Sequence, residues 1–199
     1  KTKPLKAVDG VSFELKEGET LGIVGESGCG KSTLARAVLR LVPASAGAVS
    51  WIGKDLLSMK PRALEEVRED LQIVFQDPLA SLNPRMTIGA SIAEPMLTFR
   101  KTMSSKEREA EVKAMMERVG LDPNMINRYP HELSGGQNQR VGIARAMILK
   151  PKLVICDEAV SALDVSIQAQ IIELLIGLQK DFGLSMMFIS HDLSVVREV

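Results

Sequence analysis

The sequence predicts an α/β fold built on a parallel sheet, because strand-like apolar runs alternate along the chain with segments of helical periodicity. Thr20 to Val24 runs directly into a glycine-rich loop, which is followed by apolar residues at helical spacing up to Pro43. Leu153 to Asp157 is a continuous apolar run of the kind found in strands buried on both faces. A chain of 199 residues is long enough for one substantial core, or for a core with a small subdomain.

Residues 1–76 are expected to form N-terminal antiparallel β strands and the first part of the core. Val8 to Leu15 and Thr20 to Val24 are rich in β-branched and apolar residues, and Lys16 to Glu19 between them predicts a turn. The same signals predict a short strand, a charged surface helix and a buried strand farther along: Gly47–Ile52, Pro61–Asp70 and Leu71–Phe75.

Residues 77–150 are expected to form a mostly helical insertion. From Asp77 to about Arg100 three prolines and a glycine interrupt any period, which predicts a loop-rich segment with short helices. Ser104 or Ser105 can cap a helix that ends at Gly120. A further helix should begin at Ser134 and stop before Pro151.

Residues 151–199 are expected to complete the core with the apolar strand, a long helix, a second strand and the start of another helix. The predicted bounds after the apolar strand are Ile167–Lys180, Leu184–Ser190 and Leu193–Val199. Because the chain begins with Lys1 rather than Met and ends inside a predicted helix, we interpret it as a fragment that is truncated at its C-terminus.

Composition excludes several classes of protein. The 25 Lys and Arg residues balance 25 Asp and Glu residues without a block of like charge, so nucleic acid is not expected as a partner. The longest apolar runs are far shorter than the roughly 20 residues of a membrane span. Two cysteines, in a sequence without a secretory leader pattern, exclude a disulfide scaffold.

Gly25 to Ser32 matches G-x-x-x-x-G-K-[ST] between a buried strand and an amphipathic helix, the context that this pattern requires. Its amides can curl around a polyphosphate, next to the positive end of the helix dipole. Lys31 can reach the β and γ phosphates, and the Ser32 hydroxyl can bind Mg²⁺. The predicted phosphate-binding residues are Gly25, Glu26, Ser27, Gly28, Cys29, Gly30, Lys31, Ser32 and Thr33.

Cys29 has two interpretations. It is either a passive occupant of a variable loop position or a reactive thiol, since the N-terminus of a helix lowers a thiol pKa. A dinucleotide site is not favoured, because the sequence lacks G-x-G-x-x-G.

Asp157 and Glu158 end the apolar strand, which delivers them to the carboxyl edge of the sheet where the phosphate loop also lies. Asp157 would hold the magnesium shell, and Glu158 would polarise an attacking water. Together with the loop, these residues predict a nucleoside triphosphatase with a P-loop fold.

Leu133 to Gln137 narrows this prediction, because Ser134, Gly135, Gly136 and Gln137 form a second helix start with exposed amides. With the other motifs, this run resembles the signature of ABC ATPases. The resemblance covers almost the whole chain and includes Gln76 as the glutamine loop, Ser161 to Asp164 as the aspartate loop and His191 as the switch histidine. It implies a RecA-like parallel core with an inserted helical subdomain.

The resemblance also implies roles. Gln76 would sense Mg²⁺ and the attacking water, His191 would contact the γ-phosphate and support Glu158, and Asp164 would communicate across a dimer. In this family, residues equivalent to Ser134 to Gln137 complete the ATP site of the opposite subunit, so two chains would sandwich two ATP molecules head to tail. Ala159 stands where the family usually has Pro, a difference that is expected to loosen the turn that positions Glu158.

A finer resemblance lies in Gln76 to Pro84 and in Tyr129 to Glu132, which are similar to the ATP-binding subunits of oligopeptide, dipeptide and nickel importers. It implies a peripheral subunit on the cytoplasmic face of the membrane, with a homomeric or heteromeric second ATP-binding subunit. Transmembrane permease subunits would contact the helical subdomain. The alternative function is a non-transport ABC ATPase that acts as a nucleotide-switched clamp.

Overall fold

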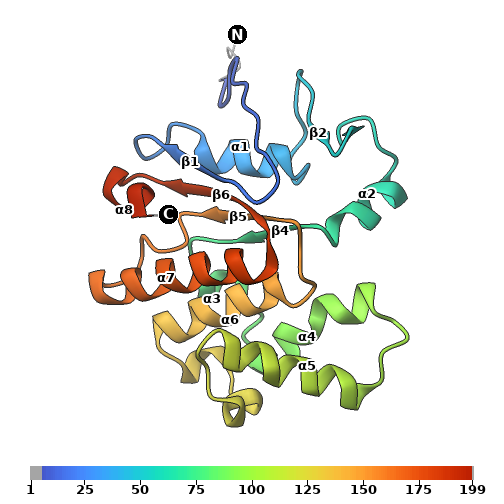
Figure 1. The fold of residues 1–199 in the computed structure, drawn as a ribbon, viewed down its shortest axis with the longest axis vertical. Coiled ribbons are helices and arrows are strands. Elements are labelled where there is room, and N and C mark those ends of the chain that lie inside the picture. The colour runs from blue at the N-terminus through green and yellow to red at the C-terminus, as the bar shows by residue number, and fades with distance from the viewer. Residues whose placement is uncertain (1–5, 199) are drawn as a thin grey trace.

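A computed structural model of the chain describes residues 6–198 and contains a four-stranded parallel sheet (Figure 1). Its strands lie in the order β1 (Thr20–Val24), β6 (Ser185–Ser190), β5 (Leu153–Asp157) and β4 (Leu71–Val74). In this register Val24 lies opposite Ser190, and Asp157 lies opposite Ile189. The segments that follow all four strands therefore leave from the same edge of the sheet.

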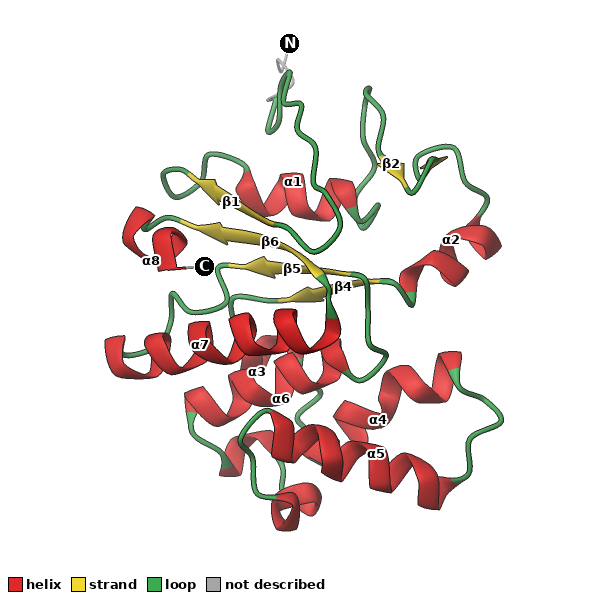
Figure 2. Cartoon of the chain, in the orientation of Figure 1, coloured by secondary structure: helices red, strands yellow, loops and turns green. Residues whose placement is uncertain are grey.

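The two inner strands, β5 and β6, are buried at every position, which explains why β5 is apolar at every position before Asp157. Leu153 and Ile155 pack into a cluster with helices α1 (Lys31–Val38) and α2 (Pro61–Arg68), whereas Val154 and Cys156 pack into the larger cluster on the other face. Figure 2 shows α1 above the sheet, with α7 (Val165–Phe182) and α6 (Gly135–Met147) below it. The period of two along a strand thus divides one apolar run between two cores.

The helices of the sheet layers follow the predicted order. Their bounds are α1 Lys31–Val38, α2 Pro61–Arg68, α7 Val165–Phe182 and α8 Leu193–Glu198. Gly183 ends α7 with a left-handed φ of 62°, as its position after the apolar period predicts. The last residue of the predicted final helix, Val199, lies outside the described residues.

The prediction of a strand over Val8 to Leu15 is wrong. This segment has no regular structure, and Val8, Val11 and Phe13 are exposed. A strand needs a partner for its backbone groups, and none of the described strands pairs with this segment. The antiparallel pair of the structure lies later, between β2 (Ser50–Trp51) and β3 (Lys54–Asp55).

Residues 77–150 are mostly helical, and they lie on the α7 side of the sheet (Figure 1). Ser104 and Ser134 cap their helices as predicted, each through a capping box with the residue three positions later. The elements are α3 Pro78–Ser81, α4 Ile88–Phe99, α5 Ser105–Arg118, η1 Pro123–Asn127, η2 Pro130–Glu132 and α6 Gly135–Met147.

Helix α4 corrects the prediction that the segment up to Arg100 contains only short helices, because it continues for 12 residues with Pro95 inside it. An interior proline costs a helix about 3 kcal/mol. Ile88, Ile92 and Met96 form one fully buried stripe, and such burial contributes about 1.5–3 kcal/mol per side chain. Packing therefore outweighs the proline. No helix within residues 6–198 is long and apolar enough to span a membrane.

Candidate functional site

The predicted phosphate loop joins β1 to α1, and its shape depends on glycine. Gly28 and Gly30 have φ values of 80° and 101°, a region that side chains disfavour. A Cβ atom on Gly30 would collide with the carbonyl of Ala7, and one on Gly25 would lie 2.9 Å from Cys29 Sγ. No side chain caps α1, so its first amides stay available to a ligand.

Lys31 is the first residue of α1, and its side chain folds back over the loop. Its Nζ donates 2.8 Å hydrogen bonds to the carbonyls of Gly25 and Glu26. It also lies 3.5 Å from Oε1 of Glu158. The ammonium group is therefore buried beside the loop on which the sequence predicts phosphate to bind.

The other predicted loop residues lie around this lysine. Glu26 contributes its backbone carbonyl, which also accepts from the amide of Cys29 at 3.3 Å. Ser27, Gly28 and Cys29 form the exposed tip, and Thr33 is half-buried in the first turn of α1. The tip of the loop is thus exposed, while its one cation, Lys31, stays covered.

Ser32 and Asp157 meet between the loop and β5. The Ser32 hydroxyl donates a 2.7 Å hydrogen bond to Oδ1 of Asp157, whose side chain is buried. A hydroxyl and a carboxylate are the hard oxygen ligands that Mg²⁺ prefers. Within residues 6–198, no group of three or more His, Cys, Asp or Glu side chains could hold a metal ion. The oxygens of Ser32 and Asp157 fit an ion whose other ligands are phosphate and water.

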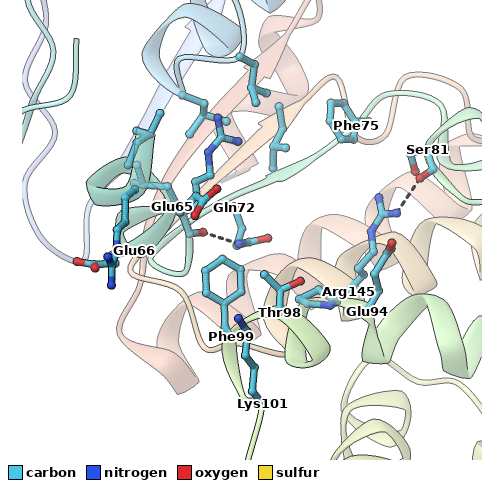
Figure 3. Close-up of a pocket in the computed structure, with 18 residues that line it drawn as sticks. Glu65, Glu66, Gln72, Phe75, Ser81, Glu94, Thr98, Phe99, Lys101 and Arg145 are labelled. Carbon is cyan, nitrogen blue, oxygen red and sulfur yellow. Dashed lines mark hydrogen bonds between the residues drawn. The ribbon is translucent and has the colours of Figure 1, made fainter. Parts of the chain in front are cut away.

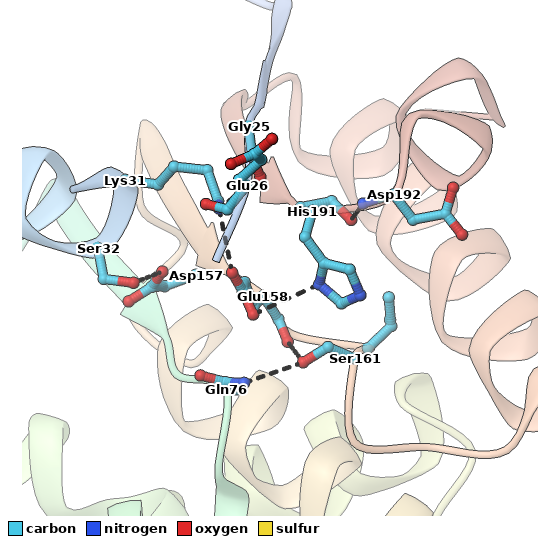
Figure 4. A network of polar contacts seen from close by, with 12 residues as sticks. Gly25, Glu26, Lys31, Ser32, Gln76, Asp157, Glu158, Ser161, His191 and Asp192 are labelled. Carbon is cyan, nitrogen blue, oxygen red and sulfur yellow. Dashed lines mark hydrogen bonds and ion pairs between the residues drawn. The ribbon is translucent and has the colours of Figure 1, made fainter. Parts of the chain in front are cut away.

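Glu158 lies at the centre of the polar network that Figure 4 shows. Its carboxylate is 13% exposed, with Lys31 on one side and Nδ1 of His191 3.6 Å away on the other. His191 follows β6, and Asp192 beside it accepts hydrogen bonds from Ser194 that lower the pKa of the Asp192 carboxyl. The structure therefore brings together the predicted base and the predicted switch histidine.

Gln76 follows β4 and joins the same network through Ser161, a residue of the predicted aspartate loop for which the sequence predicts no role of its own. Its Nε2 donates to the hydroxyl of Ser161 at 3.3 Å, and that hydroxyl donates to the Glu158 carbonyl at 3.0 Å. The sequence signal was present, because a serine three residues after a turn carbonyl commonly bonds back to it.

The Ser134 to Gln137 run is not part of this network. The side chains of Ser134 and Gln137 each accept a hydrogen bond from the other residue's backbone amide, in a capping box. Added Cβ atoms at Gly135 and Gly136 would meet Leu163 and Ile167, so the run lies against the segment around Asp164. Asp164 itself is the N-cap of α7 without a side-chain cap bond.

A groove of about 800 Å³ lies beside the Gln76 segment, between β4 with α2 on one side and α4 with α6 on the other (Figure 3). Phe75, Thr98 and Phe99 contribute to its lining. Arg145 also lines it and donates a 2.7 Å hydrogen bond to the carbonyl of Ser81. Burial lowers the pKa of the Arg145 guanidinium, and the nearby Glu94 carboxylate opposes that shift.

Taken together, the carboxyl edge of the sheet offers exposed amides, a buried ammonium, two hard oxygen ligands and a carboxylate next to a histidine. Amides and the ammonium can bind a polyphosphate, and the carboxylate can accept a proton from water. The arrangement therefore suits the hydrolysis of a phosphoanhydride.

Comparison with known proteins agrees with this geometry. A sequence profile described as ABC transporter matches residues 8–161. The chain is 66% identical, over 99% of its length, to the oligopeptide transport ATP-binding protein OppF of Escherichia coli, and it covers 59% of that protein. It is 55% identical to the oligopeptide transport ATP-binding protein AppF of Bacillus subtilis, of which it covers 60%.

Solved structures give the same result. One is a dimeric structure of a post-hydrolysis state of the ATP-binding cassette MJ0796 bound to ADP and Pi. It matches 96% of this chain and 83% of its own at 31% identity and a TM-score of 0.87. CbiO1 from Clostridium perfringens, part of the transporter complex cbiONQ, matches 96% of this chain and 74% of its own at 28% identity and a TM-score of 0.84.

Proposed function

The chain belongs to the ABC transporter family, and from this premise we propose that it is the ATP-binding and hydrolysing subunit of a peptide importer. The observation that carries the proposal is the meeting of Lys31, Ser32, Asp157 and Glu158 at one point on the sheet edge. The names of the relatives, which are oligopeptide transport proteins, support the substrate class. The chain spans about three-fifths of those relatives.

For nucleotide binding, we propose that the amides from Gly25 to Thr33 and the Lys31 ammonium hold the phosphates of ATP. Lys31 would exchange its bonds to the Gly25 and Glu26 carbonyls for bonds to phosphate oxygens. Ser32 and Asp157 would bind Mg²⁺, with the exposed side chain of Gln76 as a further oxygen ligand. Bound magnesium would neutralise phosphate charge during the transfer.

For hydrolysis, Glu158 would accept a proton from the attacking water, and His191 would orient the Glu158 carboxylate and contact the transferred phosphate. The neighbouring Lys31 and His191 side chains fix the direction of the carboxylate from two sides. Positioned general bases contribute about 10²–10⁴-fold to a rate.

We also propose that a second ATP-binding subunit completes each site in a head-to-tail dimer. The separation of Ser134, Gly135, Gly136 and Gln137 from the Lys31 and Glu158 network supports this proposal, because their helix start then serves another subunit. Asp164, which lies beside that helix start in the chain's own fold, would carry the contact between subunits. The dimeric state of the MJ0796 structure is consistent with this arrangement.

Residues 77–150 are proposed to form the helical subdomain that transmembrane permease subunits contact, at the cytoplasmic face of the membrane. The groove beside Gln76 supports this placement, because Phe75 lines it and directly precedes Gln76. A cysteine introduced at the exposed Thr98 should crosslink to a permease subunit, whereas one at the exposed Lys180 on α7 should not. Equal crosslinking from both positions would exclude the placement.

The whole function is tested with the full-length protein assembled with its permease partners in vesicles. We expect Mg²⁺-dependent ATP hydrolysis and uptake of a labelled oligopeptide that ATP supports and ADP does not. If the complex hydrolyses ATP but takes up no peptide, the proposed substrate class is wrong and the proposed ATPase activity stands. The absence of hydrolysis in the assembled complex would overturn the proposal.

A further inference from the structure

The backbone of Glu158 adopts an unfavourable conformation, which something must hold in place. Its φ is 50°, in the left-handed region that residues with a Cβ atom disfavour. Such conformations persist when the surrounding structure fixes them, and they occur often at functional sites. Residue 159 is Ala, so no proline ring restricts the backbone of Glu158 from the following position.

Hydrogen bonds on both sides of Glu158 provide this constraint. Its amide donates to the carbonyl of Ile189 in β6 at 3.0 Å. Its carbonyl accepts two hydrogen bonds from Ser161, one from the backbone amide at 3.1 Å and one from the hydroxyl at 3.0 Å. Ser161 therefore contributes both bonds on the carbonyl side of the residue that carries the proposed base.

The Ser161 hydroxyl also links Glu158 to the segment after β4. A hydroxyl has one proton to donate and two lone pairs to accept with. Because its proton goes to the Glu158 carbonyl, a lone pair receives the amide of Gln76 at 3.3 Å (Figure 4). The two hydrogen bonds therefore run in one direction, from Gln76 to Ser161 and from Ser161 to the Glu158 carbonyl. Each hydrogen bond in such a series polarises and strengthens the next.

We propose that Ser161 is a positioning residue for hydrolysis, which holds the Glu158 backbone in its left-handed conformation and makes that hold depend on Gln76. The inference rests on the proposed function, because it takes Glu158 as the general base. Ser161 acts through Glu158 and does not itself react.

The test compares Ser161→Ala, Ser161→Thr and Ser58→Ala in the full-length protein with its partners. Ser58 is a matched control, because its hydroxyl also donates to the carbonyl three residues before it, at Asp55, in an exposed turn. Since small displacements of a reacting group lower rates strongly, we expect Ser161→Ala to lower kcat about tenfold with KM for ATP within about twofold. Ser161→Thr, which keeps the hydroxyl, should stay within about threefold of wild type, and Ser58→Ala should be unchanged.

Two further measurements separate positioning from a general structural role. In a Gln76→Ala background, the loss caused by Ser161→Ala should shrink to about threefold or less, because coupled residues are not additive. A crystal structure of Ser161→Ala without nucleotide should show Glu158 outside the left-handed region. A kcat within twofold of wild type, an undiminished loss in the Gln76→Ala background, or an unchanged Glu158 φ would overturn the inference.

Failure of the proposed function has a different outcome. If the wild-type complex does not hydrolyse MgATP, the base assignment fails while the backbone measurement on Ser161→Ala still decides the structural part. If the wild type hydrolyses ATP and Ser161→Ala does so equally well, the proposed function stands and the role of Ser161 falls.

Discussion

The hydroxyl of Ser32 lies 2.7 Å from Oδ1 of Asp157, although 125 residues separate the two in the chain. Ser32 belongs to the first helix of the fold, and Asp157 ends the third strand of the sheet order. They meet because parallel strands end at one edge, where β1 delivers the loop and β5 delivers the carboxylate. This contact joins the two motifs on which the proposed ATPase depends.

Glu158→Gln should abolish hydrolysis and leave nucleotide binding intact. Glutamine keeps the size of the side chain between Lys31 and His191 and one of its acceptor oxygens, but it cannot accept the proton of water. We expect kcat to fall about 10²-fold or more, with the affinity for MgATP within a few-fold of wild type. Glu173→Gln, which neutralises an exposed carboxylate on α7, is the control and should be silent. A loss of less than tenfold would exclude Glu158 as the base.

The two glycines of the predicted signature should differ in what they do for stability. A Cβ on Gly136 would lie 2.8 Å from Cγ2 of Ile167, whereas one on Gly135 would lie 3.7 Å from Cδ2 of Leu163. Gly136→Ala should lower the free energy of unfolding by about 1–3 kcal/mol, as overpacking does. Gly135→Ala should change it little, so any ATPase loss in that variant reports on ligand contact. Urea denaturation measures both, and equal destabilisation would contradict the packing shown here.

The two cysteines should react at very different rates with a thiol reagent such as DTNB. Cys29 is exposed in the phosphate loop, and Cys156 is buried in β5. The reagent should therefore label Cys29 quickly in the native protein and Cys156 only in denaturant. Saturating MgATP should slow the fast phase about tenfold, because the occupied loop is less often open to reagent. Cys29→Ser should remove the fast phase, and persistence of that phase would place the reactive thiol elsewhere.

Cys156 should also make the protein sensitive to alkali. Burial raises the pKa of its thiol from an ordinary value of 9.0 to about 12. Between these pH values only the unfolded chain loses the proton, so the contribution to stability is complete below pH 9.0 and declines as pH rises toward 12. The slope is at most about 1.4 kcal/mol per pH unit.

Comparison with Cys156→Ala isolates this effect from other titrating groups. The stability advantage of the wild type over the variant should be constant below pH 9.0 and should shrink above it. Urea denaturation at several pH values measures the difference. A constant difference through pH 10 would mean that the thiol is not responsible.

Local signals in the sequence predicted most elements of the fold. Ser104, Ser134 and Gly183 lie at the helix ends where capping chemistry places them. The wrong predictions both depended on tertiary context. Val8 to Leu15 has strand composition but no partner among the described strands, and Pro95 breaks a pattern that the buried face of α4 outweighs.

The candidate site was predictable where the residue type and its motif point directly to a chemical role, as for Lys31, Asp157 and His191. The role of Ser161 within the predicted aspartate loop was not predictable, because it comes from the left-handed backbone of Glu158 and from the position of Gln76, and neither is visible in the sequence. The close approach of Gly30 to the Ala7 carbonyl is another such relationship between distant segments.

The strand order also has a consequence for biosynthesis. Strand β6 lies between β1 and β5, although β1 is the first of the four to be translated and β6 the last. Within the described sheet, β1 can form hydrogen bonds with its neighbour β6 only after Ser190 has left the ribosome. A nascent polypeptide that stalls before Ser185 would carry the entire glycine loop and both acidic residues, yet it would lack the strand that pairs with both β1 and β5. Until β6 emerges, the unpaired apolar segments of the nascent polypeptide are prone to aggregation.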